Sequence, residues 1–311
     1  MKQGLLICGH GSRDKEGVTH FKILVEKLQQ RYPDRIVDYG FLEFAHPVFA
    51  AAVERMYQQG VRHIIALPAI LFAGGHAKND IPYEMNSLQQ QYPDLTITMA
   101  SHLGITAPLL QLMRWLVEKA EATAGFFPRA ESCLLVVGRG TSDPDANSDV
   151  TKLTRMLWEG MGFGFATTAY IGVTKPLLQD TFPLMEQLPF KRVVVLPIFL
   201  FTGVLLRRIY DQVAAQQALS PGKEYIATES LGSHEWLLQA IDTRIAEAEK
   251  GNPNMNCQLC KYRTQIIGFE SEQGKEQIGH HLNVKGILFE EKEKPGDKKG
   301  IFSTVKKALG I

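Results

Sequence analysis

The sequence predicts an α/β protein made of two tandem repeats, each a parallel four-stranded sheet flanked by helices. The first observation behind this prediction is that short apolar runs alternate with segments of helical periodicity, as in parallel sheets covered by helices. The second is that motifs return at one constant offset: LPAILFAGG at residues 67–75 is followed 129 residues later by LPIFLFTGV. A repeat at fixed spacing indicates one structural unit made twice.

The first repeat occupies residues 1–125. Its strands are short apolar runs bounded by glycine, proline or polar residues, and we expect them at residues 4–9, 36–43, 63–67 and 95–100. A helical segment follows each strand, and these segments end near residues 32, 59, 91 and 122. The carboxyl ends of all four strands should therefore lie along one edge of the sheet.

The second repeat occupies residues 130–249, after a short linker at residues 125–129. Its strands are expected at residues 133–138, 165–172, 192–196 and 224–229. Residues 250–311 lack periodicity and form a tail, which we expect to be flexible. This tail contains a C-x-x-C pair and two adjacent histidines, which are Cys257, Cys260, His280 and His281.

Composition sets broad limits on the function. The chain has 311 residues, 45% of them hydrophobic, and a net charge of +1, so no bulk field attracts nucleic acid or a membrane surface. No apolar window approaches the 18 or more residues of a membrane-spanning helix. Cys8 and Cys133 fall in apolar strand runs, where cysteine acts as a small buried side chain. We expect a cytoplasmic location, and the sequence leaves the oligomeric state open, a homodimer included.

Nucleotide-binding motifs are absent from the sequence. GHGSRD after the first strand starts like G-x-G-x-x-G, but Asp14 holds the third glycine position, and Asp143 does so in the second repeat. The sequence also lacks the P-loop motif and the G-x-S-x-G nucleophile elbow. A dinucleotide site, an ATP site and an α/β-hydrolase site are therefore disfavoured.

Three metal-binding side chains follow neighbouring strands of the first repeat. His10 follows the first strand, Glu43 ends the second, and His76 follows the third, so they should converge at one sheet edge. Two imidazoles and a carboxylate suit a divalent ion such as Co²⁺, Fe²⁺, Ni²⁺ or Zn²⁺. The alternative is that each has a structural role. Since Arg139 and Leu205 occupy the positions of the two histidines in the second repeat, we favour a metal site in the first repeat only.

The same segments resemble a known family. HGSRD at residues 10–14, FLEFAHP at residues 41–47 and LFAGGHAKNDIP at residues 71–82 together resemble the sirohydrochlorin chelatases, class II tetrapyrrole chelatases. The resemblance covers residues 1–249. It implies insertion of Co²⁺ or Fe²⁺ into sirohydrochlorin in cobalamin or sirohaem biosynthesis, without ATP. It also implies that His10 and His76 hold the metal and accept pyrrole protons, and that Glu43 accompanies them.

The tail is similar to the long form of the cobalt enzyme, although this chain has only two adjacent histidines where that form carries a long histidine run. Cys257 and Cys260 supply two of the four ligands that a zinc site or an Fe–S cluster needs. The remaining ligands would come from His280 and His281 or from a second chain. A redox-sensitive cysteine pair is the alternative.

Basic residues on the predicted loops are candidates for binding the carboxylates of the macrocycle. They are Arg13, Lys78, Arg139, Arg207 and Arg208, with His46 as a further residue lining the cleft. The alternative for each is a solvated surface charge. The alternative for the whole protein is a non-catalytic divalent-metal carrier that uses the same histidines.

Overall fold

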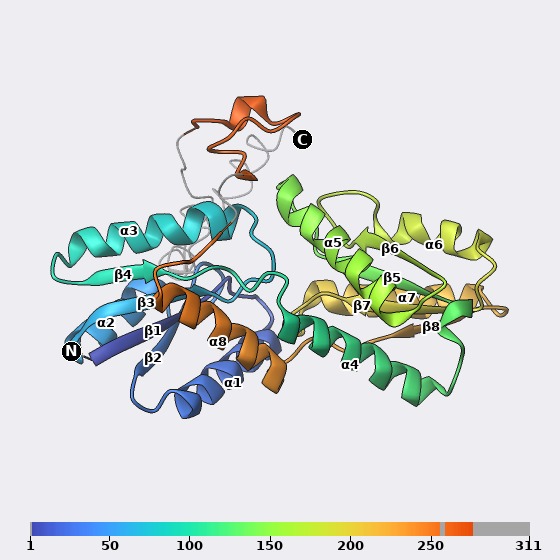
Figure 1. Cartoon of the computed structure of the whole chain (residues 1–311), viewed down its shortest axis with the longest axis horizontal. Coiled ribbons are helices and arrows are strands. Elements are labelled where there is room, and N and C mark those ends of the chain that lie inside the picture. Colours follow the sequence, from blue (N-terminus) through green and yellow to red (C-terminus); the bar gives the residue numbers. More distant parts are fainter. Residues whose placement is uncertain (1, 256–258, 276–311) are drawn as a thin grey trace, which may run out of the picture.

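Two sheets of four parallel strands form the frame of the molecule, which the computed structural model describes for residues 2–255 and 259–275 (Figure 1). The first sheet has the order β2-β1-β3-β4 and contains β1 (Lys2–Gly9), β2 (Ile36–Phe41), β3 (Val61–Pro68) and β4 (Thr96–Met99). The second has the order β6-β5-β7-β8 and contains β5 (Ser132–Gly138), β6 (Phe165–Tyr170), β7 (Arg192–Pro197) and β8 (Glu224–Ala227). The predicted two-repeat α/β fold is confirmed.

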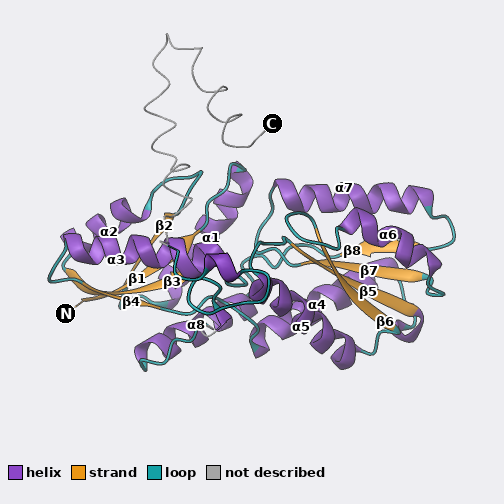
Figure 2. Ribbon diagram, turned by 90° about the horizontal axis from the view of Figure 1, so that it is seen from above, coloured by secondary structure: helices purple, strands orange, loops and turns teal. Residues whose placement is uncertain are grey.

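Helices cover both faces of each sheet (Figure 2). Those of the first half are α1 (Lys15–Arg31), α2 (Phe49–Gln58), the π-helical turn η1 (His76–Asp80), α3 (Ile81–Gln91) and α4 (Ala107–Ala124). Those of the second half are the 3₁₀ turn η2 (Arg129–Glu131), α5 (Pro144–Met161), α6 (Leu178–Gln187), α7 (Val204–Leu219) and α8 (Glu235–Glu249). A further 3₁₀ turn, η4 (Glu270–Glu272), lies in the C-terminal segment. Among the described helices, none combines the length and apolar character that a membrane span requires.

The aspartates that break the glycine motif are helix caps. The Asp14 carboxylate accepts hydrogen bonds from the backbone N–H groups of Glu16 and Gly17 at the start of α1. Asp143 does the same for Asp145 and Ala146 at the start of α5. These carboxylates occupy the helix N-termini that a nucleotide phosphate would need, which explains why the third glycine is missing.

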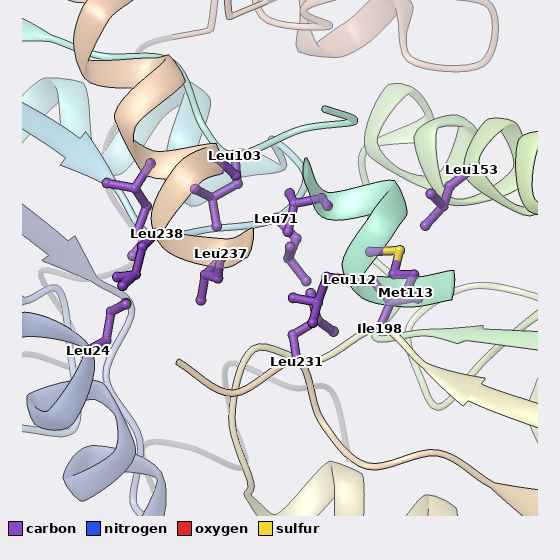
Figure 3. Packing of buried hydrophobic residues seen from close by; sticks show 14 of the residues in the cluster. Leu24, Leu71, Leu103, Leu112, Met113, Leu153, Ile198, Leu231, Leu237 and Leu238 are labelled. Carbon is purple, nitrogen blue, oxygen red and sulfur yellow. The ribbon is translucent and has the colours of Figure 1, made fainter. Parts of the chain in front are cut away.

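The fourth helix of each repeat covers the sheet of the other repeat. α4 packs against β7 and β8, and α8 packs against β3, while α4 and α8 also contact each other. Figure 3 shows the result: Leu237 and Leu238 of α8 lie near Leu24 of α1, and Met113 of α4 lies near Leu153 of α5. One apolar core therefore runs through both halves of the molecule, whereas each sheet has a separate core on its other face. Sequence periodicity does not reveal this exchange.

The carboxyl ends of both sheets face a common cavity of about 750 Å³. Its walls include the loops after β1, β3, β5 and β7, at residues 10–13, 69–76, 139–142 and 198–205. The repeat relationship thus brings two equivalent sets of loops to one space, as expected for ligand sites at the ends of parallel strands.

Candidate metal centre

His10, Glu43 and His76 form a cluster at the carboxyl edge of the first sheet. The ligand atoms of the three side chains all lie within 4.8 Å of one another. His10 comes directly after β1, Glu43 lies two residues beyond β2, and His76 is the first residue of η1. Both imidazoles line the cavity, and Glu43 is buried at 5% exposure. The structure thus brings together the three residues that the strand order predicts.

The backbone beyond β1 and β2 fixes the distance between His10 and Glu43. The backbone N–H of Glu43 donates to the His10 carbonyl oxygen at 3.0 Å, which continues the pairing of the two strands. At Gly11, φ is +94°, and a Cβ there would lie 1.7 Å from the Glu43 carbonyl oxygen. Only glycine fits this close approach. Gly11 therefore allows the loop that carries His10 to lie against the loop that carries Glu43.

His10 presents an unprotonated nitrogen to Glu43. Its Nδ1 lies 3.0 Å from the Gly11 carbonyl oxygen, which can only accept, so Nδ1 carries the proton and Nε2 carries a lone pair. This Nε2 is 3.2 Å from Glu43 Oε1, but the alignment is not that of a hydrogen bond, and Nε2 has no hydrogen-bond partner. Two electron-rich atoms at this distance repel each other unless a cation or a proton lies between them.

Electrostatics keep His10 in the form that binds metals. Burial, followed by the nearby His76 ring, lowers the pKa of His10 to about 4. The Arg139 guanidinium of the second repeat lowers this pKa further, so it acts on the same site. His10 is therefore neutral at physiological pH, as a ligating imidazole must be.

A buried carboxylate orients His76. Its Nδ1 donates to Asp80 Oδ2 at 2.6 Å, and Asp80 is 1% exposed. The side-chain amide of Asn79 donates to the other oxygen, Oδ1, of Asp80 at 2.9 Å. In the neutral ring, this hydrogen bond selects the tautomer with the lone pair on Nε2, as in many metal sites where a carboxylate holds the outer nitrogen of a histidine ligand. Sequence reasoning missed Asp80, although its spacing four residues after His76 in a helical segment was a usable signal.

The cavity beside the cluster is large and mostly apolar, with arginines at its border. Arg13 and Arg139 both line it, and the Arg13 guanidinium lies over the Phe44 ring at 4.8 Å. Apolar lining comes from both repeats and includes Phe21, Phe41, Phe72, Ile198, Phe199 and Leu200. The volume falls in the range of sites for cofactor-sized ligands.

Lys78 is placed differently from our sequence-based prediction. Its Nζ donates to Asp143 Oδ2 at 2.9 Å and to Asp145 Oδ2 at 2.8 Å, and the residue is 3% exposed. Burial alone would lower the pKa of Lys78, but the hydrogen bonds with Asp145 and Asp143 outweigh it and raise the pKa. Two carboxylates already surround the buried ammonium, so a substrate carboxylate has no access to it. Lys78 instead joins η1 to the second repeat.

Two further sequence candidates lie outside the cavity lining. Arg207 is half-exposed and forms ion pairs with Asp14 and Glu16 at the start of α1. His46 is exposed and follows the cluster on the loop after β2. Neither residue is part of the cavity wall, so neither is placed to contact a ligand in the cavity.

The C-terminal segment returns to this region of the molecule. Cys260 is a free thiol at 1% exposure, whereas Cys257, His280 and His281 lie outside the described residues. Tyr262, two residues after Cys260, lines the cavity. No periodic pattern connects this tyrosine with the metal cluster, whose nearest member along the chain, His76, lies 186 residues earlier.

Comparison with known proteins decides the family. A family model described as CbiX matches residues 4–120 and, a second time, residues 133–248. The chain belongs to the CbiX family. A sirohydrochlorin cobaltochelatase from Priestia megaterium is 31% identical over 280 residues, covering 90% of this chain and 88% of the relative. A sirohydrochlorin ferrochelatase from the same species is 29% identical over 250 residues, covering 80% and 91%.

Solved structures agree with this assignment. SirB from Bacillus subtilis, whose structure contains Fe³⁺, superposes with a TM-score of 0.73 and 26% identity over 82% of this chain and 100% of SirB. The resemblance to sirohydrochlorin chelatases that the motifs indicated is therefore confirmed for the family and the fold.

Proposed function

We propose that this protein inserts a divalent metal ion, Co²⁺ or Fe²⁺, into sirohydrochlorin without ATP, in cobalamin or sirohaem biosynthesis. The observation that carries the proposal is the position of His10 Nε2, a buried lone pair 3.2 Å from a carboxylate oxygen of Glu43. A divalent cation bound by both atoms would remove the repulsion between them. The names of the two Priestia megaterium relatives support the choice of substrate.

The substrate metal is held by His10 Nε2, His76 Nε2 and Glu43 in this proposal. Three protein ligands leave coordination positions for the nitrogens of the incoming macrocycle, so the ion can pass from protein to tetrapyrrole without becoming uncoordinated. Since both histidines line the cavity, the metal faces the space where the macrocycle binds.

The ligands divide the proton chemistry between them. Insertion releases two pyrrole protons, and the groups freed by the departing metal are close enough to accept them. His10 is a poor acceptor because burial lowers its pKa to about 4. We assign proton acceptance to Glu43 and to His76, which the hydrogen bond from Nδ1 to Asp80 Oδ2 at 2.6 Å holds in place. This assignment narrows the sequence-based expectation that both histidines accept protons.

Arg13 and Arg139 are the proposed substrate-binding residues. Sirohydrochlorin carries many carboxylates, and both guanidiniums border the cavity. Arginine binds carboxylates through two parallel hydrogen bonds, which would fix the macrocycle plane relative to the metal. In this proposal, the first repeat at residues 1–125 supplies the metal ligands and the second at residues 130–249 supplies part of the anion-binding wall.

Cobalt is the preferred substrate metal in this proposal. The match to the cobaltochelatase relative spans 280 residues, which is longer than the two repeats together, so it extends into the segment after residue 249. The 250-residue match to the ferrochelatase need not extend into that segment. We further propose that Cys257 and Cys260 form an accessory zinc or Fe–S site, which metal analysis of the full chain and of Cys260→Ser would test. We also propose a reducing, cytoplasmic location, in which Cys8 and Cys133 remain free thiols.

The decisive experiment is a metal-insertion assay with the full chain. The absorption of sirohydrochlorin is followed after addition of Co²⁺, Fe²⁺ or Ni²⁺, with a protein-free reaction as the control. We expect turnover with Co²⁺ and Fe²⁺. Tight metal binding with no acceleration of insertion by any of the three ions would identify a metal carrier and contradict the proposal.

A further inference from the structure

The C-terminal segment is anchored beside the cavity rather than far from it. Asn254 exchanges two hydrogen bonds with Ser101, at the end of the first sheet: its N–H donates to Ser101 Oγ at 2.7 Å, and its carbonyl accepts from the same hydroxyl at 3.0 Å. Lys261 is 5% exposed and its Nζ donates to the Ser142 carbonyl at 3.4 Å, in the loop after β5. Figure 1 shows this segment above the junction of the two halves. Both repeats thus hold the segment in place.

Tyr262 is the residue of this segment that reaches the cavity. Its side chain is part of the cavity lining, and its hydroxyl lies 3.5 Å from where a Cβ on Gly75 would be. Gly75 directly precedes His76, so the phenol lies beside the loop that carries a metal ligand. The backbone holds this position, since the Gly274 N–H donates to the Tyr262 carbonyl at 3.1 Å.

A neutral tyrosine offers an apolar ring face together with one O–H donor. This combination suits a flat aromatic macrocycle whose edge carries carboxylates.

We propose that Tyr262 is a substrate-binding residue that contacts the tetrapyrrole, and that the C-terminal segment is therefore part of the sirohydrochlorin site. This inference rests on the proposed function. It assigns the segment a role in binding the macrocycle, distinct from any role of its cysteines. It also extends the proposed substrate site beyond the two repeats at residues 1–249.

The test compares Tyr262→Ala and Tyr262→Phe with Phe269→Ala in the full chain. Phe269 is the matched control, because it belongs to the same segment and contacts Lys261 at 4.9 Å, as Tyr262 does at 5.3 Å, but does not line the cavity. KM is measured for sirohydrochlorin at saturating Co²⁺ and for Co²⁺ at saturating sirohydrochlorin. Equilibrium binding of sirohydrochlorin without metal is measured from its change in absorption.

We expect Tyr262→Ala to raise both KM and Kd for sirohydrochlorin about tenfold, which corresponds to about 1.4 kcal/mol. The KM for Co²⁺ should stay within about twofold. Tyr262→Phe keeps the ring and should raise the sirohydrochlorin KM about two- to threefold, and Phe269→Ala should leave it unchanged.

Two results would overturn the inference. One is an unchanged sirohydrochlorin KM and Kd in Tyr262→Ala. The other is an equal rise in Phe269→Ala, which would trace the effect to the folding of the segment. A wild-type chain that turns over no metal would instead count against the proposed function, and the binding measurement would still decide the role of Tyr262.

Discussion

The two repeats have nearly the same backbone at the cavity but different side chains. Gly11 and Gly140 both have positive φ, at +94° and +82°, and each lies against the backbone carbonyl of the loop after the next strand. The residues that directly follow these carbonyls, Phe44 and Val173, also correspond, because both have positive φ, at 63° and 66°. The His–Glu–His cluster is nevertheless present in the first repeat only. The scaffold geometry is thus independent of the metal site that it carries.

The differences between the repeats assign a role to each side of the cavity. Where the first repeat has His10, Glu43 and His76, the second has Arg139, Gly172 and Leu205 at the corresponding positions. Even the carboxylate that orients His76 is missing, because Ile209 stands in the place of Asp80. One wall of the cavity therefore carries the proposed cation ligands, and the other carries the positive charge proposed to bind the anionic macrocycle.

The largest effect should follow from removing one of the histidines that the first repeat has and the second repeat lacks. His10→Ala or His76→Ala removes one of the three proposed metal ligands, so the insertion rate should fall at least about a hundredfold, more than the loss of a residue that only orients a ligand. The measurement is the initial rate at saturating Co²⁺. His63→Ala is the matched control, because His63 bonds to Thr98 within the same sheet and lies outside the cluster. A rate near wild type in either ligand variant would contradict the site.

Removing the orienting carboxylate should have the next largest effect. Asp80→Asn retains the shape of the side chain but replaces the charged acceptor of the His76 Nδ1 proton. We expect Co²⁺ affinity to fall about 10- to 100-fold, as for other outer-shell partners of ligating histidines. Titration with Co²⁺ measures this directly. An unchanged affinity would mean that His76 needs no partner to hold its orientation.

The charge of the second wall should act mainly on binding of the macrocycle. Arg139→Ala removes a charge-assisted hydrogen-bond donor, so the KM for sirohydrochlorin should rise about tenfold with kcat little changed. Arg207→Ala is the control, since Arg207 pairs with Asp14 and Glu16 outside the cavity. Equal effects of the two substitutions would show a general charge effect and not a contact.

The smallest effect concerns pH and stability. His102 of the first repeat corresponds to Leu231 of the second, and burial, followed by the charges of Arg244 and Lys78, lowers the pKa of His102 to about 4. The folded state therefore holds a neutral imidazole, while the unfolded state gains a proton below about pH 6.5. Stability should consequently be highest above pH 6.5 and fall as pH drops toward 4.

Between pH 7 and pH 6 the loss from His102 should be only about 0.7 kcal/mol. Urea unfolding at several pH values measures it, and His102→Leu, which copies the second repeat, should flatten this part of the profile. The same slope in the variant would show that His102 does not contribute to it.

Sequence reasoning succeeded where local pattern determines position. Parallel strands end at one edge, so the convergence of His10, Glu43 and His76 followed from the order of strands and loops. It did not succeed where partners lie far apart in the chain. Lys78 finds its carboxylates at Asp143 and Asp145 of the other repeat, and no local signal distinguishes such a buried lysine from one that faces a ligand.

The exchange of the fourth helices escaped prediction for a related reason. An amphipathic helix such as α4 needs an apolar surface, but its periodicity does not state which of two equivalent sheets provides that surface. The position of Tyr262 could not be predicted either, because its segment has no periodic sequence pattern and is held by contacts with distant parts of the chain.

The exchange of α4 and α8 also limits how the molecule can move and unfold. Separating the halves would pull each helix off the sheet that it covers and expose the apolar core shared by both repeats. The halves should therefore unfold in one cooperative step, and a single half expressed alone would carry an uncovered sheet face. A hinge between the halves would break this core, so the two sides of the cavity should stay at a fixed distance from each other.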